Sequence, residues 1–266
     1  MPLPLIQFEI SMDDFHTMRH RIGWKHEYWD GQAQLSPSST AIADFQLRIW
    51  KKNDEVVQPC EPAVGILRIP EPSDTEELVR LHSEVFESAI EYAGYDEASY
   101  HQSNMESIAA FFGQSNRRGY AHGVLAYSRV IEQSGRLIAA LLVRAEDADD
   151  AASLVVQPIM VAAEHQRHGL GRCLLDAVRS ALAGDDRHYL NSRCHLGNEA
   201  SMAWHRAVGF EEQPSMFAAS HRAHHHSWMA RHHTAAGREL EAFYHGELAE
   251  VNAQLKVACE QIKWGK

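Results

Sequence analysis

The fold of this chain is decided by the stretch VAAEHQRHGLG, residues 161–171. Before it lies an apolar run over residues 153–161, which predicts a strand covered on both faces. After it, Leu170, Leu174, Val178 and Leu182 recur every four residues and predict an amphipathic helix. A buried strand that passes through a polar turn into such a helix indicates an α/β fold.

The turn has the features of an anion site. Glycines at 169 and 171 let a ligand approach the backbone closely. The start of the helix offers unpaired N–H groups and the positive end of the helix dipole, a combination suited to a pyrophosphate. The spacing Gln166-x-x-Gly169-x-Gly171 is shorter than the dinucleotide fingerprint and lacks the Lys-Ser/Thr of a P-loop. It therefore favours neither a Rossmann domain nor an NTPase.

Composition narrows the functional classes further. The formal net charge is −11, which argues against nucleic acid as a partner, because phosphate-backbone binding needs a positive face. The chain starts without a basic leader and has no apolar run long enough to span a bilayer, so we expect no membrane contact and a cytoplasmic location. The four scattered cysteines predict buried thiols in a reducing compartment.

Histidine is over-represented, with 18 copies, of which six lie between positions 221 and 233. No HExxH motif or cysteine partner accompanies them, so we predict polarity at a surface or interface and no metal. The region 216–229 is predicted to hold two short strands.

A second motif follows the first by about 30 residues and consists of Asn198, Ser201, His205, Gly209 and Phe210. With Gln166-x-x-Gly169-x-Gly171, it resembles the GNAT superfamily of N-acetyltransferases, whose second motif is Asn-x-x-Ala-x-x-x-Tyr-x-x-x-Gly-Phe. The resemblance covers residues 64–229. It implies a GNAT-like mixed central sheet flanked by helices, with acetyl-CoA as the cosubstrate and no metal.

The resemblance also implies a cofactor site. The N–H groups from Arg167 to Arg172 would hold the pyrophosphate, and the strand backbone would bind the pantetheine and polarise the thioester. Asn198 would touch the pantetheine from the following helix. The residues so implied are Ile159, Met160, Val161, Gln166, Arg167, His168, Gly169, Leu170, Gly171, Arg172 and Asn198.

The implied reaction is direct transfer of acetyl to a primary amine, of a small molecule or a peptide, in a ternary complex. His205 stands where the family often has tyrosine, and it either protonates the departing thiolate or merely packs. Glu164 and His122 are weaker candidates for general acid–base work, and Gln157 could also face the cleft. The alternatives are a non-catalytic acyl-CoA-binding or sensing module, and an interaction protein built on the terminal segments.

The chain divides into three parts on its sequence pattern. Residues 1–60 form an extension, in which Asp30-Gly31 predicts a hairpin and 42–50 another strand. Residues 61–232 form the acetyltransferase-like domain, with a helix expected after a capping box at Ser73 and Glu76. Residues 233–266 hold a long helix over 236–262.

Apolar residues repeat along that last helix at alternating intervals of three and four. Such a seam packs either against the domain or against another chain. With exposed aromatics in the hairpin, it predicts a homodimer. The seam consists of Tyr244, Leu248, Val251, Leu255, Ala258 and Ile262.

Overall fold

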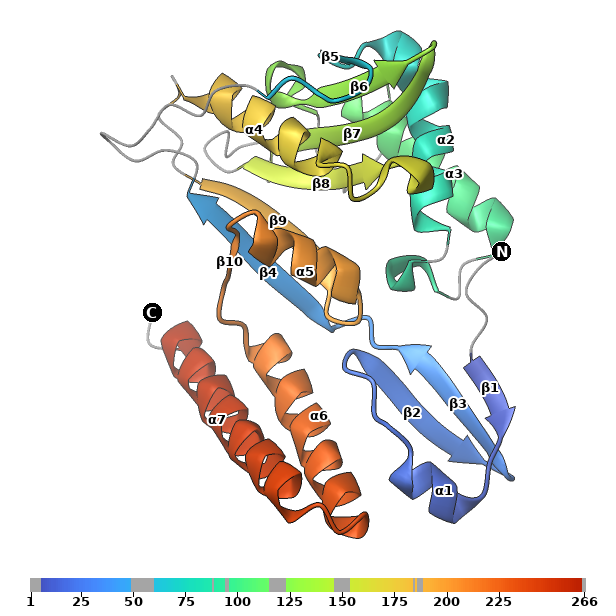
Figure 1. The fold of residues 1–266 in the computed structure, drawn as a ribbon, viewed down its shortest axis with the longest axis vertical. Coiled ribbons are helices and arrows are strands. Elements are labelled where there is room, and N and C mark those ends of the chain that lie inside the picture. The colour runs from blue at the N-terminus through green and yellow to red at the C-terminus, as the bar shows by residue number, and fades with distance from the viewer. Residues whose placement is uncertain are drawn as a thin grey trace.

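The computed structural model describes residues 6–48, 60–87, 89–93, 96–114, 123–145, 154–183, 185 and 189–264. Its centre is a mixed seven-stranded sheet, and the predicted α/β class is confirmed (Figure 1). In spatial order the strands are β10 (Glu211–Glu212), β4 (Ile42–Arg48), β9 (Tyr189–His195), β8 (Leu154–Val161), β7 (Arg136–Ala145), β6 (Arg129–Gln133) and β5 (Ile66–Arg68).

Helices cover both faces of this sheet. Ala140 and Leu142 of β7 pack with one group of helices, while Ala139, Leu141 and Val143 pack with another. This alternation explains why β7 is apolar on both faces. The first face carries α2 (Thr75–Phe86) and α3 (Glu97–Phe111), and the second carries α4 (Leu170–Leu182) and α5 (Glu199–Ala207). Short 3₁₀ turns are η1 (Pro72–Asp74), η2 (Ile90–Tyr92), η3 (Leu125–Tyr127) and η4 (Ala163–His165).

The strand β4 comes from the N-terminal segment but belongs to the central sheet. It pairs antiparallel with β9 from Ile42↔His195 to Arg48↔Tyr189, and with β10 on its other edge. Ala43, Phe45 and Leu47 point into the core, as strand alternation requires. Part of the segment 1–60 is therefore structurally continuous with the acetyltransferase-like sheet.

The rest of the N-terminal segment forms a small three-stranded sheet. Asp30 and Gly31 both have positive φ, 45° and 83°, as a type I′ turn requires, and the predicted hairpin is confirmed. The short helix α1 is capped by Ser11, whose side chain accepts the N–H of Asp14. The elements are β1 (Ile6–Glu9), α1 (Met12–Thr17), β2 (Trp24–Trp29) and β3 (Gln32–Pro37).

Two local predictions are wrong. Residues 216–229 are not strands: they lie within α6 (Met216–Ala235), which is capped by Ser215 and packs along α7 (Glu239–Trp264). The capping box before α2 is formed by Glu71 and Asp74 rather than by Ser73 and Glu76. Arg68 donates to both oxygens of Asp74 at 2.7 Å, and this pair fixes the start of the helix.

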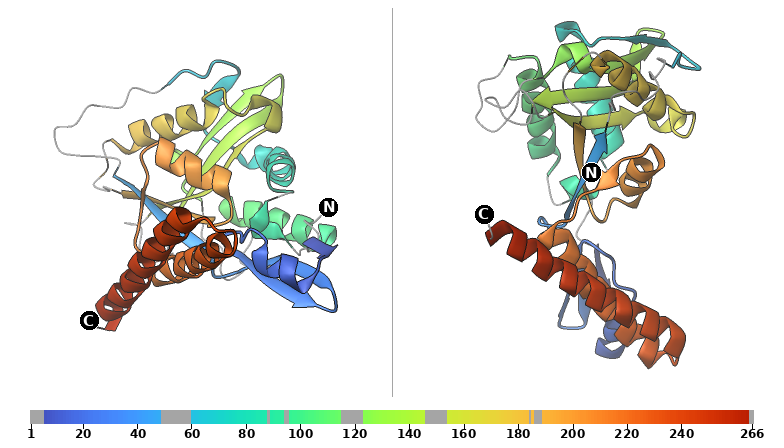
Figure 2. Two further views of the ribbon diagram at one scale, coloured as in Figure 1. Left: turned by 60° about the horizontal axis from the view of Figure 1, so that its bottom comes forward. Right: turned by 90° about the vertical axis from the view of Figure 1, so that its left-hand side faces the viewer.

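In Figure 2, α6 and α7 lie side by side and project away from the central sheet. None of the helices within the described ranges combines the length and the apolar character needed to cross a membrane.

The histidine-rich part of α6 contacts the N-terminal hairpin, and we call this contact the histidine junction. It is formed by His20, His26, His225 and Trp228. His20 is 4% exposed, its Nδ1 lies 3.3 Å from Nδ1 of His225, and its ring lies 4.3 Å from that of His26. Two facing nitrogens can share one hydrogen only while at least one of the two rings is neutral, because a protonated ring has no acceptor nitrogen. These contacts place the histidines as polar groups in the interface between the N-terminal segment and α6.

Burial lowers the pKa of His20 to about 3 and those of His26 and His225 to about 4. The pKa of His20 is lowered further by nearby positive charges, which are those of His26, His224, His225 and Arg231. The folded chain thus binds fewer protons than the unfolded chain once the pH falls below about 6.5, the ordinary histidine value. Stability is then lost as the pH falls from about 6.5 toward 4, and is fully present above that window.

We therefore expect the midpoint of thermal unfolding to fall between pH 7 and pH 5 and to stay level from pH 7 to pH 8. His20→Phe keeps a planar ring but cannot be protonated, so its midpoint should fall less over the same interval. The exposed His101 provides the control, since His101→Gln should leave the pH slope unchanged. Equal slopes for the wild type and His20→Phe would contradict the role of the junction.

Candidate active site

The site begins where two parallel strands stop pairing. β8 and β9 are paired only from Leu154↔Leu190 to Val156↔Ser192, and beyond this they diverge (Figure 1). On its other edge β8 stays paired with β7 as far as Val161↔Ala139. The result is a strand with one free edge at its carboxyl end.

The register shows which backbone groups line this free edge. Ala162 donates its N–H to Ile138 of β7 at 2.9 Å. Backbone N–H groups point to alternate sides along a strand. The N–H of Met160 therefore also points toward β7, while the N–H groups of Ile159 and Val161 point toward β9. The side chain of Gln166 donates to the Val161 carbonyl at 3.1 Å and closes the end of the strand.

The predicted anion turn follows directly. Gly169 is the N-cap of α4 with φ 81°, a conformation that favours glycine, and a Cβ there would meet nothing within 4 Å. The N–H groups of residues 167–172 have no acceptor within the described part of the chain. Arg167, His168 and Arg172 are exposed around them. The turn therefore presents free donors and positive charge together, as an anion site needs.

The second glycine of the motif serves packing. A Cβ on Gly171 would lie 3.1 Å from Nε1 of Trp204 and 3.6 Å from Cδ1 of Ile159. Gly171 therefore lets Trp204 of α5 lie against the first turn of α4, where it packs against the core. Leu170 is buried beneath the same turn and fixes α4 on the sheet.

Asn198 lies at the start of α5, and both of its side-chain polar atoms are engaged. Its Oδ1 accepts the N–H of Ser201 at 3.0 Å, which caps the helix. Its Nδ2 donates to the two oxygens of Glu91 at 3.0 and 3.2 Å. Glu91 lies in η2, 107 residues away, and the sequence analysis missed it. No local motif marks that position.

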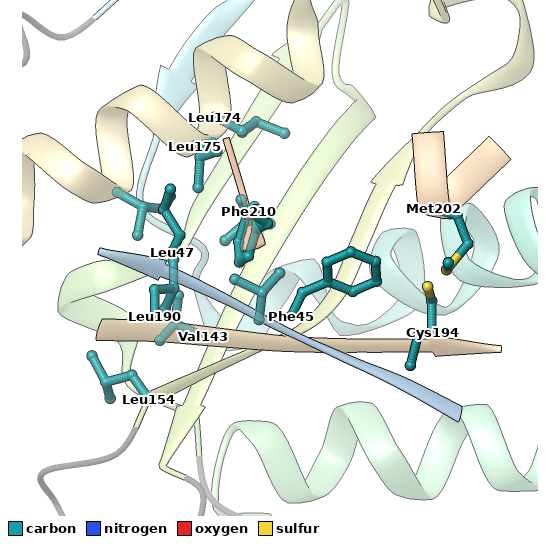
Figure 3. Packing of buried hydrophobic residues seen from close by; sticks show 14 of the residues in the cluster. Phe45, Leu47, Val143, Leu154, Leu174, Leu175, Leu190, Cys194, Met202 and Phe210 are labelled. Atoms are coloured by element: carbon teal, nitrogen blue, oxygen red, sulfur yellow. The ribbon is translucent and has the colours of Figure 1, made fainter. Parts of the chain in front are cut away.

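His205 lies in the core rather than at the surface of the site. It is 1% exposed, and its ring stacks on Phe45 at 4.6 Å. Nδ1 donates to the Ser201 carbonyl at 2.7 Å, so Nε2 accepts from the Ser192 hydroxyl, also at 2.7 Å. Figure 3 shows Phe45 within the cluster of buried apolar side chains that also contains Leu190 and Phe210. Burial lowers the pKa of His205 and keeps the ring neutral. The general-acid role stays a prediction, and the geometry favours the packing alternative.

The weaker candidates for acid–base work are Glu164, Gln157 and His122. Glu164 is exposed in η4, with Oε1 4.0 Å from Nε2 of His165. Gln157 is exposed on β8, and Arg144 donates to its carbonyl at 3.1 Å. His122 lies outside the described residues. Within the described ranges, no three histidine, cysteine or acidic side chains are grouped so that they could hold a metal ion.

The free strand edge and the glycine turn lie next to each other in the chain, and comparison with known proteins shows what this region resembles. Residues 124–212 match the model of the acetyltransferase (GNAT) domain. This part of the chain, from η3 to β10, is therefore similar to the GNAT acetyltransferases. Comparison with curated proteins gives no match.

Several solved structures are similar in fold. A GCN5-related N-acetyltransferase from Sphaerobacter thermophilus is 13% identical, with a TM-score of 0.45, over 65% of this chain and 48% of that one. An aminoglycoside antibiotic 6'-N-acetyltransferase from Acinetobacter haemolyticus is 17% identical, with a TM-score of 0.39, over 56% and 93%. A GNAT family acetyltransferase from Brucella melitensis in complex with acetyl-CoA is 18% identical, with a TM-score of 0.32, over 44% and 70%.

The position of His205 makes a prediction about stability. His205→Phe preserves the stack on Phe45 but removes the partner of the buried Ser192 hydroxyl. An unsatisfied buried polar group costs about 1–3 kcal/mol, and we expect a loss of that size in urea unfolding. CoA affinity should stay within about twofold, because both ring nitrogens of His205 are engaged by Ser201 and Ser192 inside the core. A variant of wild-type stability whose kcat is at least tenfold lower would contradict this and support the general-acid role.

Proposed function

We propose that the chain transfers acetyl from acetyl-CoA to a primary amine by direct attack in a ternary complex. The observation that carries this proposal is the free edge of β8, which leads into the glycine turn at the start of α4. The first supplies donors for an extended polar chain such as pantetheine, and the second supplies donors for a pyrophosphate. In coenzyme A the pantetheine is joined directly to the pyrophosphate, and the strand edge and the glycine turn follow each other in the same order.

In this arrangement the N–H groups of residues 167–172 hold the pyrophosphate, with Arg167 and Arg172 adding positive charge. The N–H of Ile159 bonds the pantetheine arm. The N–H of Val161, at the end of the free edge, donates to the thioester oxygen and stabilises the negative charge that develops there when an amine attacks. Asn198, occupied by Ser201 and Glu91, acts on the acceptor side through Glu91 rather than directly on the pantetheine.

The cysteines support direct attack rather than a covalent enzyme intermediate. Cys173 and Cys194 are buried, and burial raises their pKa values to about 12 and about 11. Each stays a thiol at neutral pH, whereas the thiolate is the nucleophilic form. Cys60 is exposed, contrary to the prediction of buried thiols, and its carbonyl accepts the Cys173 Sγ–H at 3.0 Å.

The first test is CoA binding by Gly169→Glu. A left-handed backbone and a new carboxylate beside the pyrophosphate both oppose binding, so we expect at least tenfold weaker affinity by calorimetry. Gly135, in the turn between β6 and β7, has φ 77° and equally open surroundings. Gly135→Glu should therefore show the same backbone strain with unchanged CoA affinity. If Gly169→Glu binds CoA as the wild type does, the assigned turn is wrong.

Turnover separates this proposal from a non-catalytic acyl-CoA-binding module. Both bind acetyl-CoA, but only the enzyme releases free CoA faster when an amine is added.

We also propose that the chain forms a homodimer through α7. Three residues of the seam predicted from the sequence are exposed on α7: Tyr244 is 60% exposed, Val251 59% and Leu255 36%. The face that contacts α6 includes His245, whose Nδ1 lies 3.0 Å from that of His226. A row of apolar side chains along one exposed helix supports association with another copy.

Val251→Asp places a charge in the middle of this seam and should convert a dimer to a monomer at micromolar concentration. The measurement is the mass by light scattering. Ala253 is exposed on α7 outside the seam, so Ala253→Asp should leave the mass unchanged. A wild type that already has the monomer mass would contradict the proposal.

A further inference from the structure

The carboxylate of Glu91 lies on the edge of β9 that β8 leaves open. Leu196 donates its N–H to Ala41 beside β4 at 2.6 Å, so by alternation the N–H of His195 points to the opposite edge, toward β8. Oε1 of Glu91 accepts that N–H at 3.2 Å. The side chain therefore occupies the position where a backbone acceptor of β8 would lie if the two strands were still paired.

This carboxylate is held in place by a fixed set of donors. Asn198 donates to both of its oxygens, and Asn198 is itself fixed because its Oδ1 caps α5. Oε2 accepts only the 3.2 Å contact from Asn198 within the described part of the chain, so it keeps lone pairs for a ligand. The side chain is half-buried.

Glu91 has no cationic partner among the described residues, since no lysine, arginine or histidine side chain there lies within ion-pair distance of it. Other partly buried acids of this domain are paired: Asp74 with Arg68, and Glu77 with Arg80. A partly buried carboxylate is ordinarily paired with a positive charge. The missing charge beside Glu91 is the one that a protonated amine would bring.

The surroundings hold η2 against the end of β9. A Cβ on Gly197 would lie 2.5 Å from Cδ1 of Ile90 and 3.2 Å from Nε1 of Trp24. Only a residue without a side chain lets these two groups come so close. Trp24 belongs to β2, so the N-terminal hairpin borders the same corner of the site.

We infer that Glu91 binds the ammonium group of the acceptor and takes its proton, an inference that rests on the proposed acetyl transfer. A primary alkylamine, with a pKa of about 10.4 like that of lysine, is protonated at neutral pH and cannot attack. Glu91 accepts one proton from the ammonium and later passes it to water. The freed nitrogen pair forms the C–N bond as the C–S bond breaks, and the second nitrogen proton goes to the departing thiolate. The products are the acetylated amine, CoA thiol and one released proton.

The test is Glu91→Gln, which keeps an oxygen for the N–H groups of His195 and Asn198 but cannot take a proton. We expect kcat/KM at pH 7 to fall by about 100-fold, within the usual range for general acid–base catalysis. CoA affinity and the unfolding midpoint should not change. The acceptors to assay are kanamycin, spermidine and a peptide with an amino-terminal alanine. Glu97→Gln, at an exposed acid in the first turn of α3, is the matched control and should keep full activity.

The pH profile distinguishes proton transfer from a structural role. As the pH rises from 7 to 9.5, more of the amine is already neutral, so the deficit of Glu91→Gln should shrink at least tenfold. A deficit that stays constant across this range would overturn the inference, as would a variant as active as the wild type at pH 7. If the wild type binds CoA but acetylates none of the three acceptors, Glu91 has no proton to take and the inference also fails. A wild type that does not bind CoA would instead contradict the proposed function itself.

Discussion

The early end of pairing between β8 and β9 is the constraint on which the rest of the site depends. Pairing stops after Val156, and the next residues of β8 are poorly suited to continue it. Arg144 occupies the Gln157 carbonyl at 3.1 Å, and the register with β7 shifts between the pairs Val156↔Val143 and Ile159↔Leu141. On the other strand, Glu91 already accepts the N–H of His195. Each strand thus has a separate reason not to pair, and the edges stay open to a ligand.

The two sides of this opening are built by different parts of the chain. The proposed cofactor side is local, because one strand, one turn and one helix in sequence order supply every donor. The proposed acceptor side is assembled from η2, the end of β9, the start of α5 and the hairpin residue Trp24. A site of this kind can keep its cofactor while its acceptor changes, since the two sides share few residues. This division agrees with the family model, which covers residues 124–212 and leaves η2 and the hairpin outside.

The sequence was sufficient to predict the local features. The spacing of Gln166, Gly169 and Gly171 predicted the turn, and Asp30-Gly31 predicted the hairpin, because each needs only backbone conformations that neighbouring residues set. The proposed role of Glu91 and the burial of His205 could not be found in this way. The partner of Glu91 lies 107 residues away, and His205 is buried by Phe45, which comes from the N-terminal segment. The helical run at 216–229 was also misjudged, because its polar histidines are covered by the hairpin and α7 rather than by solvent.

The placement of β4 between β9 and β10 has a consequence for how the chain folds. Gln46 and Asn191 are joined by a side-chain hydrogen bond across 145 residues, and the strands that carry them are neighbours along their full length. During synthesis β4 emerges long before β9, so its apolar face, with Ala43, Phe45 and Leu47, must wait for its partner. Pairings over such long sequence separations form late, because closing the intervening loop costs entropy before any contact offsets it. The half of the sheet that carries β9 is therefore the last to close, and until it closes its exposed strand edges are open to chaperones and to aggregation.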